Sequence, residues 1–400
     1  MKVIHVLATN LLSSSVGGSG TYIREYFKNR RSDMQLALVG AVQDSEAEVG
    51  KWIKEEINGR RFDFFPILHL GRKDYTYHGG IPSNALFIFR LWRYHQQFLS
   101  KNAIVHIHRP ELAIPFVIPT KRYPIVLTIH GVGNQISITK THPFFKRRWF
   151  RSFYFLLEDC VIKKADRVIL VSQEGKKYYL NKFPDQKKKF TYIPTSVDTI
   201  LFKPMNKSKL RRKYGFFDNE KIAMFVGRFH EQKGINLLID AFAELKKQIP
   251  KARLVLVGDG ILKRSLEEQI ERLQLHDVTF MGIVGHDRLP EVLNCADVFV
   301  LPSLWEGMSI AVLEALSCGI PVVSTNVGQM KEVVKEGISG FIIEKRCATL
   351  LMEKIKSALS LAPRMSVHCR QIAERYSSSY LARKIEEIYE GMQSNGLHAD

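Results

Sequence analysis

Two basic side chains follow a short apolar run in the second half of this 400-residue sequence. Arg228 comes two residues after the run 222–226 ends, and Lys233 is separated by Gly234 from a stretch with helical spacing. Ligands bind at the carboxyl ends of parallel strands, and the N-terminus of a helix favours an anion. Two cations at this position predict a clamp for a diphosphate group. For an isolated pair, two solvated loop charges are the alternative.

Two carboxylates mark a second segment, which reads as strand, turn and helix. Glu306 lies in the turn after the run 298–301, and Glu314 lies inside the helix expected to start near Ser309. The first N–H groups of a helix have no partner within it and are available to phosphate or sugar oxygens. An acidic turn residue and a surface charge are the alternatives for the two glutamates. However, Glu314 sits among apolar residues and needs a polar partner there.

Short apolar runs rich in Val and Ile alternate with amphipathic helical patterns along the whole chain. Continuous runs of this kind are typical of parallel strands that are buried on both faces. One helical pattern spans 235–249 and is stopped by Pro250. The alternation predicts a doubly wound α/β architecture. The expected strands are 3–8, 36–42, 104–108, 125–129, 168–171, 190–193, 222–226, 254–257, 278–281, 298–301, 322–324 and 340–343.

The length suits two domains. Proline and turn residues at 194–204 separate two β-α series, so we expect domains at 1–197 and 198–376. The remaining segment, 377–400, contains a charged amphipathic helix at 380–392. We expect this helix to cross back to the first domain.

The second-half motifs, taken together, resemble the retaining glycosyltransferases of family 4, which have the GT-B fold of two Rossmann-like domains facing across a cleft. The resemblance covers nearly the whole chain and is strongest from Phe225 to Glu344. Four motifs carry it in order: Val-Gly-Arg with Lys-Gly at 226–234, Leu-Val-Leu-Val-Gly-Asp-Gly at 254–260, Ala-Asp-Val-Phe-Val-Leu-Pro-Ser at 296–303, and two glutamates with seven residues between them.

The resemblance implies roles for residues of the second domain. Arg228 and Lys233 would hold the donor diphosphate and stabilise it as a leaving group. Glu306 would contact hydroxyl groups of the donor sugar, and Glu314 would bind those of the ribose. Main chain near Gly282–Val284 would hold the base. Further donor contacts are implied for Val284, Gly307, Met308, Ser309 and Ile310.

The first domain would supply two more pieces. Gly17 and Gly18, on the first strand–helix loop, resemble a family glycine pair that lets backbone approach the donor phosphate. His130, at the end of the run 125–129, resembles the histidine that faces the donor sugar. A flexible loop and a structural histidine are the alternatives. Ser309, Ile261 and the pair Thr195-Ser196 depart from the residues frequent in the family, which affects sugar specificity.

The implied reaction transfers a hexose-type sugar with retention from a nucleotide-diphosphate sugar, a UDP- or GDP-sugar, which is a co-substrate. No cofactor and no metal are expected, because the second half has no Asp-x-Asp motif near the donor residues and the cationic pair can neutralise the diphosphate. His130, Arg228, Lys233 and Glu306 are the candidate catalytic residues. The acceptor would be a lipid-linked or polysaccharide-precursor hydroxyl group.

Charge is distributed unevenly. The net charge of +19 divides into +15 for residues 1–200, with 31 basic and 16 acidic residues, and +4 for residues 201–400. The segment 140–155 has basic and aromatic residues and no acidic residue, and 182–189 is a second basic run. We expect 140–155 to contact an anionic membrane surface. A solvated face over an aromatic core, and steering of a soluble anionic acceptor, are the alternatives.

The sequence shows no evident signal peptide and no long apolar run, and its five cysteines form no C-x-x-C pair. We therefore expect a cytoplasmic protein and, if the membrane contact forms, one that is peripheral on the inner face of the plasma membrane. Two other functions are compatible with parts of the sequence. One is a nucleotide-sugar 2-epimerase of the same fold. The other is a basic nucleic-acid-binding protein, although no nucleic-acid-binding module is recognisable and we expect no nucleic-acid partner.

Overall fold

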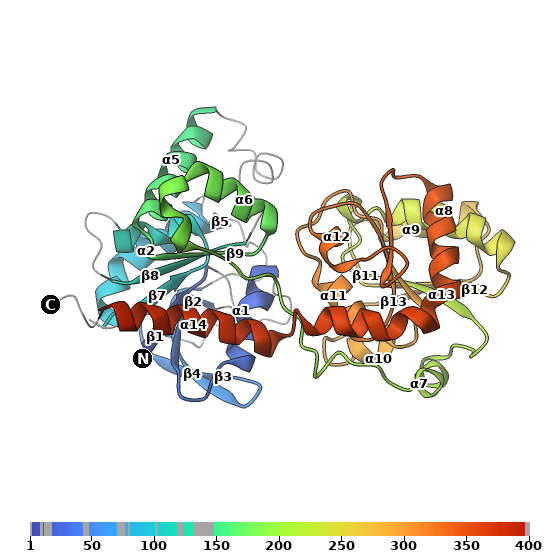
Figure 1. The fold of residues 1–400 in the computed structure, drawn as a ribbon, viewed down its shortest axis with the longest axis horizontal. Helices are drawn as coiled ribbons and strands as arrows, with labels where there is room; N and C mark the ends of the chain where they lie inside the picture. Colours follow the sequence, from blue (N-terminus) through green and yellow to red (C-terminus); the bar gives the residue numbers. More distant parts are fainter. Residues whose placement is uncertain are drawn as a thin grey trace. The chain divides into compact units, whose positions relative to one another are not determined.

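The fold is described from a computed structural model, which places residues 2–8, 11, 18–42, 48–69, 77–78, 81–100, 103–117, 123–130 and 148–396. Contacts divide the chain into two compact units (Figure 1). Unit 1 comprises Met1–Thr195 and Ser379–Asp400, and unit 2 comprises Ser196–Ser378. Both boundaries lie within two residues of the positions expected from the sequence.

Unit 1 is built on an eight-stranded sheet with the order β10-β9-β8-β7-β1-β2-β4-β3. Neighbouring strands are parallel except for the antiparallel pair β3–β4. The strands are β1 (Lys2–Val6), β2 (Gln35–Val42), β3 (Ile53–Ile57), β4 (Arg60–His69), β7 (Ile104–Ile107), β8 (Ile125–Ile129), β9 (Arg167–Leu170) and β10 (Phe190–Tyr192). A separate pair joins β5 (Tyr77–His78) to β6 (Ile81–Pro82).

Helices cover both faces of this sheet. The helical segments are α1 (Gly18–Asn29), α2 (Ser83–Phe98), η1 (Pro110–Ala113), α3 (Ile114–Val117), α5 (Arg148–Lys164), α6 (Gln173–Lys182), η3 (Pro184–Lys189) and α14 (Ser378–Gly396). One apolar cluster joins the sheet to α2, α3, α5 and α6. A second cluster joins the other face to α1 and α14. The last helix of the chain is therefore part of unit 1, and Figure 1 shows it in red beside α1 and β1.

Unit 2 is built on a six-stranded parallel sheet with the order β13-β12-β11-β14-β15-β16. Its strands are β11 (Lys221–Val226), β12 (Ala252–Val257), β13 (Val278–Gly282), β14 (Val298–Leu301), β15 (Val322–Thr325) and β16 (Gly340–Ile343). Its helical segments are α7 (Lys207–Tyr214), η4 (Glu231–Lys233), α8 (Ile235–Gln248), α9 (Lys263–Arg272), α10 (Leu289–Leu293), α11 (Ile310–Ser317), α12 (Met330–Val333) and α13 (Ala348–Glu374).

The strand order of unit 2 reverses between β11 and β14. Counted within the unit, the order is 3-2-1-4-5-6, which is that of the doubly wound nucleotide-binding fold. At such a reversal the loops after the two central strands diverge to opposite faces of the sheet and leave a crevice at its carboxyl edge. The expected α/β architecture is confirmed, and this edge is where a ligand site belongs.

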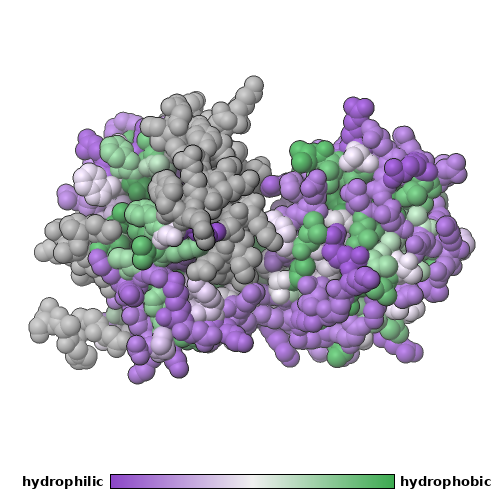
Figure 2. Space-filling view, turned by 90° about the horizontal axis from the view of Figure 1, so that it is seen from above, coloured by the Kyte–Doolittle hydropathy of each residue, from purple (hydrophilic) through white to green (hydrophobic). Residues whose placement is uncertain are grey.

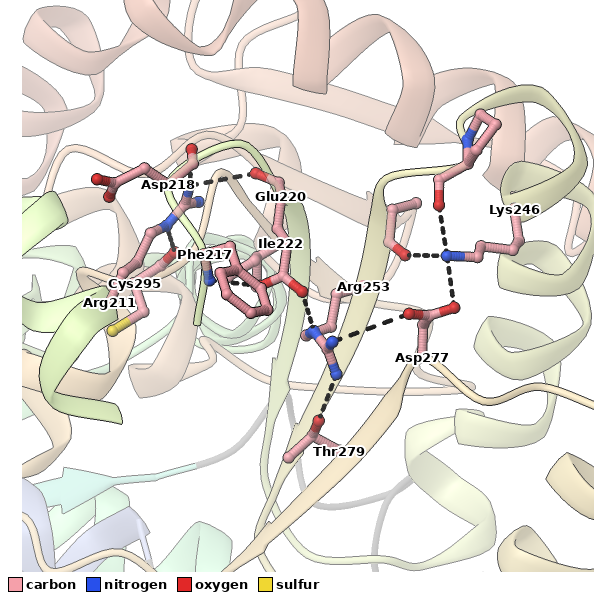
Figure 3. Close-up of polar contacts among 12 residues, drawn as sticks. Arg211, Phe217, Asp218, Glu220, Ile222, Lys246, Arg253, Asp277, Thr279 and Cys295 are labelled. Atoms are coloured by element: carbon pink, nitrogen blue, oxygen red, sulfur yellow. Dashed lines mark hydrogen bonds and ion pairs between the residues drawn. The ribbon is translucent and has the colours of Figure 1, made fainter. Parts of the chain in front are cut away.

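The amino edge of the same sheet is closed by polar contacts instead (Figure 3). Arg253, at the start of β12, donates to Glu220 Oε1 at 2.6 Å and to Thr279 Oγ1 at 3.2 Å. Asp277, just before β13, pairs with Lys246 of α8 at 2.5 Å. These contacts tie the beginnings of three strands together, so the edge opposite the crevice is stabilised by internal pairs.

All twelve expected strands are present, with ends shifted by at most two residues. The hairpin β3–β4 was missed. Its strands read Ile-Lys-Glu-Glu-Ile and Arg-Arg-Phe-Asp-Phe-Phe-Pro-Ile-Leu-His, and their charged residues and proline interrupt the apolar run used to find strands. β3 is an edge strand with one neighbour, where outward-facing charges are tolerated.

No helix in the described ranges is long and apolar enough to cross a membrane. On the face drawn in Figure 2, the apolar residues of unit 2 form small groups separated by hydrophilic ones.

Candidate functional site

The two loops expected to bind the donor leave the sheet of unit 2 on either side of the strand reversal. One follows β11 and carries Arg228 and Lys233, and the other follows β14 and carries Glu306. The backbone joins them: Leu304 N–H donates to Gln232 O at 2.7 Å. The Gln232 side chain also donates to Trp305 O at 2.9 Å. Residues 73 positions apart in the sequence thus form one polar surface.

Lys233 and Glu306 form an ion pair at the centre of this surface. Lys233 Nζ lies 2.6 Å from Glu306 Oε1, and Ser303 Oγ donates to the same oxygen at 2.7 Å. Ser303 is fully buried, and the Glu306 side chain is only 9% exposed. A carboxylate held by two donors has a fixed direction, and a partly buried ion pair is screened less by salt than an exposed one. Ser303 was not singled out as a site residue from the sequence.

Two glycines allow backbone to approach the turn after β14 closely, one from the loop after β11 and one from the loop after β15. Gly234 has φ +65°, and a Cβ at this position would lie 2.3 Å from Pro302 O. Gly328 has φ +52°, and its Cβ would lie 2.3 Å from the carbonyl oxygens of Glu306 and Gly307. Any other residue at either position is strained in φ and also clashes with backbone.

Arg228 is exposed, while Met308 and Ile310 are half-buried and Gly307 is exposed. Ser309 is buried and is the N-cap of α11, but its side chain makes no capping hydrogen bond to the described residues. The first N–H groups of α11 therefore lack a side-chain cap from Ser309. This helix begins one residue after the expected start.

Glu314 has the polar partner that its apolar surroundings require. It lies in α11 with 4% exposure, and His286 Nε2 is 3.1 Å from its Oε1. The ring of His286 also contacts Phe202, with centroids 5.1 Å apart. His286 follows the half-buried Val284 on the loop after β13, the loop where the resemblance implied main-chain contacts. No spacing signal pointed to this histidine, because it lies 28 residues before Glu314.

The candidates in unit 1 have a different setting. Gly17 lies outside the described residues, and Gly18 is the first residue of α1 rather than a loop residue. His130 follows the end of β8, as expected, and is half-buried. Its Nε2 is 3.1 Å from Nδ1 of His108, and its ring meets that of Tyr22 edge-on at 5.1 Å. Burial lowers the pKa of His130 to about 4, so the ring is neutral at pH 7.

The basic and aromatic segment 140–155 is described only from Arg148 onward, where α5 begins, and its earlier residues lie outside the described ranges. On α5, Phe153 and the neighbouring Leu156 are 62% and 70% exposed. Tyr154 instead turns inward, and its hydroxyl donates to Glu111 at 3.0 Å. In the second basic run, Lys182 pairs with Asp159 at 2.5 Å. The aromatic residues of α5 thus divide between the surface and the protein interior.

Comparison with known families covers most of the chain. Residues 206–376 match the family described as Glycosyl transferases group 1, and residues 16–200 match the one described as Glycosyltransferase Family 4. The Escherichia coli protein named UDP-Gal:alpha-D-GlcNAc-diphosphoundecaprenol alpha-1,3-galactosyltransferase is 30% identical over 316 residues. That alignment covers 74% of this chain and 77% of the relative. The Bacillus anthracis N-acetyl-alpha-D-glucosaminyl L-malate synthase is 26% identical over 299 residues, covering 72% of this chain and 74% of that protein.

Solved structures share the fold at low sequence identity. Sucrose-phosphate synthase from Thermosynechococcus elongatus superposes with a TM-score of 0.78 at 19% identity, covering 98% of this chain and 99% of the other. Anabaena HepE in complex with UDP-glucose gives 0.67 at 19% identity, covering 98% and 100%. These likenesses concern the fold alone. The named relatives support a transferase over the epimerase and the nucleic-acid-binding protein considered from the sequence.

Proposed function

Because this chain belongs to glycosyltransferase family 4, we propose that it is a retaining hexosyltransferase that uses a UDP- or GDP-sugar. The observation that carries this proposal is the Lys233–Glu306 pair beside the N-terminus of α11, at the strand reversal of unit 2. Lys233 would bind the diphosphate and Glu306 would bind the sugar hydroxyls. The two groups are adjacent, with Lys233 Nζ 2.6 Å from Glu306 Oε1. Arg228, on the same loop as Lys233, would complete the clamp.

The reaction would proceed as follows. The bond between the anomeric carbon and the diphosphate oxygen breaks, and negative charge develops on the diphosphate. Arg228, Lys233 and the N–H groups of residues 308–310 stabilise that charge, which is commonly the largest catalytic contribution. The acceptor oxygen bonds to the anomeric carbon on the same face, and its proton passes to the departing diphosphate. His130, Glu306 and Ser303 would position the sugar without exchanging a proton, and no metal or cofactor takes part.

We further propose a lipid-linked or polysaccharide-precursor acceptor, and a protein that is cytoplasmic and peripheral on the inner face of the plasma membrane. The name of the Escherichia coli relative specifies a diphosphoundecaprenol-linked acceptor. The exposed Phe153 and Leu156 of α5 and the net charge of +15 in residues 1–200 favour contact with an anionic membrane. This contact would bring the enzyme to its acceptor.

Thermal unfolding with UDP, GDP and ADP tests the donor site. A ligand at about 100 times its Kd raises the free energy of unfolding by ~2.7 kcal/mol. We expect one nucleoside diphosphate to raise the Tm of the wild type and to lose that effect in Lys233→Ala. The matched control is Lys354→Ala, since Lys354 also pairs with a glutamate at 2.6 Å, but away from these loops.

The control should keep the full ligand-induced shift. If no nucleoside diphosphate stabilises the wild type at millimolar concentration, the donor site is not where we place it. If Lys354→Ala removes the effect as completely as Lys233→Ala does, the loss reflects general destabilisation and not the loss of a clamp.

A further inference from the structure

Unit 1 contains four histidines that its sheet brings to one place. His5 lies in β1, His106 in β7, and His108 and His130 directly follow β7 and β8. In the sheet β1 pairs with β7, and β7 pairs with β8. Side chains two residues apart point to the same face of a strand. His5, His106 and His108 therefore share the face that α1 and α14 cover, together with Thr128 and His130.

Hydrogen bonds connect these side chains in a line, which we call the histidine chain, and Tyr26 branches from it by a hydrogen bond to Tyr389. From one end to the other its members are Thr128, His106, Tyr389, His5, His108 and His130. The successive heavy-atom distances are 2.7, 2.5, 3.4, 3.0 and 3.1 Å. Apart from His130, every member is at most 1% exposed. Tyr389 comes from α14, so the last helix of the chain supplies the central link.

The ring geometry shows that neighbouring histidines face each other with their nitrogen atoms at hydrogen-bond distance. The rings of His5 and His108 have centroids 5.3 Å apart and planes inclined by 16°. The 3.0 Å nitrogen–nitrogen contact and the radii of two imidazole rings account for that separation, so the rings meet edge to edge. His108 and His130 repeat this arrangement, with 5.3 Å between centroids and 28° between planes.

A metal ion fits this geometry poorly. Ligand nitrogens of His5, His106 and His108 lie within 4.8 Å of one another. Two nitrogens bound to one tetrahedral zinc ion at ~2.0–2.1 Å lie about 3.3 Å apart, and both point at the ion and not at each other. The 3.0 Å between Nδ1 of His5 and Nε2 of His108 is a hydrogen-bond distance instead.

The protonation state makes the chain directional. Burial lowers the pKa of His5, His106 and His108 well below the usual value, and each ring is neutral at pH 7. A neutral imidazole has one N–H donor and one acceptor nitrogen. If His5 donates to His108, then His108 must donate to Nε2 of His130. If His5 accepts from His108, then His130 donates through Nε2.

We propose that the histidine chain sets the tautomer and orientation of His130, with Tyr389, His5 and His108 as its positioning residues. The tautomer of a histidine is set by the hydrogen bond that one of its nitrogens makes. In His130 the bonded nitrogen is Nε2, so Nδ1 is the nitrogen left to address a ligand. Whether Nδ1 then carries a proton or a lone pair depends on the hydroxyl of Tyr389, three hydrogen bonds away.

The consequence for transfer rests on the proposed function, in which His130 meets the donor sugar. A histidine that offers the same nitrogen in the same protonation state to every sugar is already organised for the transition state. The packing of α14 against β1 and β7 would then affect the reactivity of His130, at the carboxyl edge of the sheet.

The test combines NMR spectra, which report the tautomer of His130 without any reaction, with kinetic constants for sugar transfer. The protein is labelled with ¹⁵N-histidine, and the His130 resonances are assigned with a His130→Gln variant. The ¹⁵N chemical shifts of a histidine report its tautomer directly. The same protein samples are assayed for kcat and for the donor KM. Tyr389→Phe removes one hydroxyl group and keeps the ring, and His108→Phe interrupts the chain next to His130.

Tyr22→Phe is the matched control. The Tyr22 hydroxyl is buried with no hydrogen-bond partner among the described residues, while its ring touches His130. Tyr22→Phe thus removes a buried hydroxyl beside His130 but outside the chain. We expect Tyr389→Phe and His108→Phe to change the His130 tautomer and Tyr22→Phe to leave it unchanged. In both chain variants kcat should fall about tenfold, which is less than the ~10²–10³-fold cost of removing a positioned donor outright. The donor KM should stay near that of the wild type.

An unchanged His130 spectrum in Tyr389→Phe overturns the proposal, and this variant alone decides if His108→Phe does not fold. An equal spectral change in Tyr22→Phe also overturns it, because packing would then be the cause. Full transfer activity of His130→Gln would instead contradict the role of His130 in the proposed function. The spectra would still decide whether the histidine chain sets its tautomer.

Discussion

Glu314 shows how a charged side chain can lie inside an apolar helix. The carboxylate is 4% exposed, and His286 lies 3.1 Å from it. A buried carboxylate without a partner would cost several kcal/mol, so the histidine stabilises the folded state and also fixes the direction of the acid. In the proposed function, that direction decides whether Glu314 can receive the ribose hydroxyls. The same reasoning applies to Glu306, whose carboxylate is oriented by both Ser303 and Lys233.

Replacing His286 separates these two effects. His286→Phe keeps a ring against Phe202 but removes the nitrogen that faces Glu314. We expect a loss of about 1–3 kcal/mol in the free energy of unfolding. We also expect roughly tenfold weaker binding of the preferred nucleoside diphosphate, equivalent to ~1.4 kcal/mol. Chemical denaturation and isothermal titration calorimetry measure the two quantities.

The control is His286→Gln, which retains an N–H donor of similar reach. It should recover part of the nucleotide affinity. If the glutamine variant binds no better than the phenylalanine variant, orientation of Glu314 by a donor at position 286 is not what the ligand requires.

At the scale of elements, the candidate site depends on two loops meeting at the reversal of strand order in unit 2. Hydrogen bonds within each loop are supplemented by contacts between the two loops. The loop after β11 is joined to the turn after β14 by backbone and side-chain contacts. Gly234, between η4 and α8, allows a close approach, because a Cβ added there would lie 2.3 Å from Pro302 O. The observed spacing of the two loops therefore requires a residue without a side chain at position 234.

Gly234→Ala should separate the loops. An added Cβ would lie 2.3 Å from Pro302 O, and φ +65° is also unfavourable for alanine. Gly215→Ala is the matched control, since Gly215 has φ +77° with nothing within 4 Å of an added Cβ. The left-handed conformation alone costs about 1–2 kcal/mol.

We expect Gly215→Ala to show that cost in urea denaturation with unchanged nucleotide binding. Gly234→Ala should lose more stability and most of the binding. Equal losses in the two variants would mean that the close approach to Pro302 has no energetic effect.

At the scale of the whole molecule, the chain starts and ends in the same unit. After unit 2 is complete, α14 returns to the sheet of unit 1 and inserts Leu381, Ile385 and Tyr389 into its core. That core also contains the histidine chain, whose four histidines are neutral at pH 7. A core that contains neutral histidines makes the stability of unit 1 dependent on pH.

We expect the stability of unit 1 to fall as the pH decreases below 6.5. Burial lowers the pKa of His5, His106 and His108 well below 6.5 and that of His130 to about 4 in the folded protein. At a pH between the pKa of a histidine in the folded protein and its pKa in the unfolded chain, only the unfolded chain binds a proton on that histidine. Each histidine thus lowers the free energy of unfolding by about 1.4 kcal/mol per pH unit. For His130 the loss levels off near pH 4.

Tryptophan fluorescence between pH 7.5 and 5 measures this effect. The tryptophans are Trp52, Trp92, Trp149 and Trp305, so a Trp305→Phe background reports on unit 1 alone. In that background His108→Phe should flatten the pH dependence by about one proton, whereas His276→Asn, at an exposed position of unit 2, should leave it unchanged. A Tm of unit 1 that stays constant from pH 7.5 to 5.5 contradicts the prediction.

Much of this molecule is determined by the sequence alone. The strands, the helix 235–248 and its end before Pro250, and the division near residue 195 follow from local patterns, because side-chain periodicity and proline act on neighbouring residues. The motifs around Arg228, Lys233, Glu306 and Glu314 indicated the family, which the comparisons confirm. The roles assigned to those residues remain predictions.

Other features were decided only by the tertiary structure. The edge hairpin β3–β4 carries charges that obscure its pattern. His286 meets Glu314 only because the loop after β13 lies over α11. Above all, the histidine chain joins β1, β7, β8 and a helix residue 283 positions beyond His106. The lateral order of the strands and the return of α14 arise from the burial of whole sheet and helix faces, to which many distant residues contribute. No local spacing in the sequence encodes which two histidines will meet.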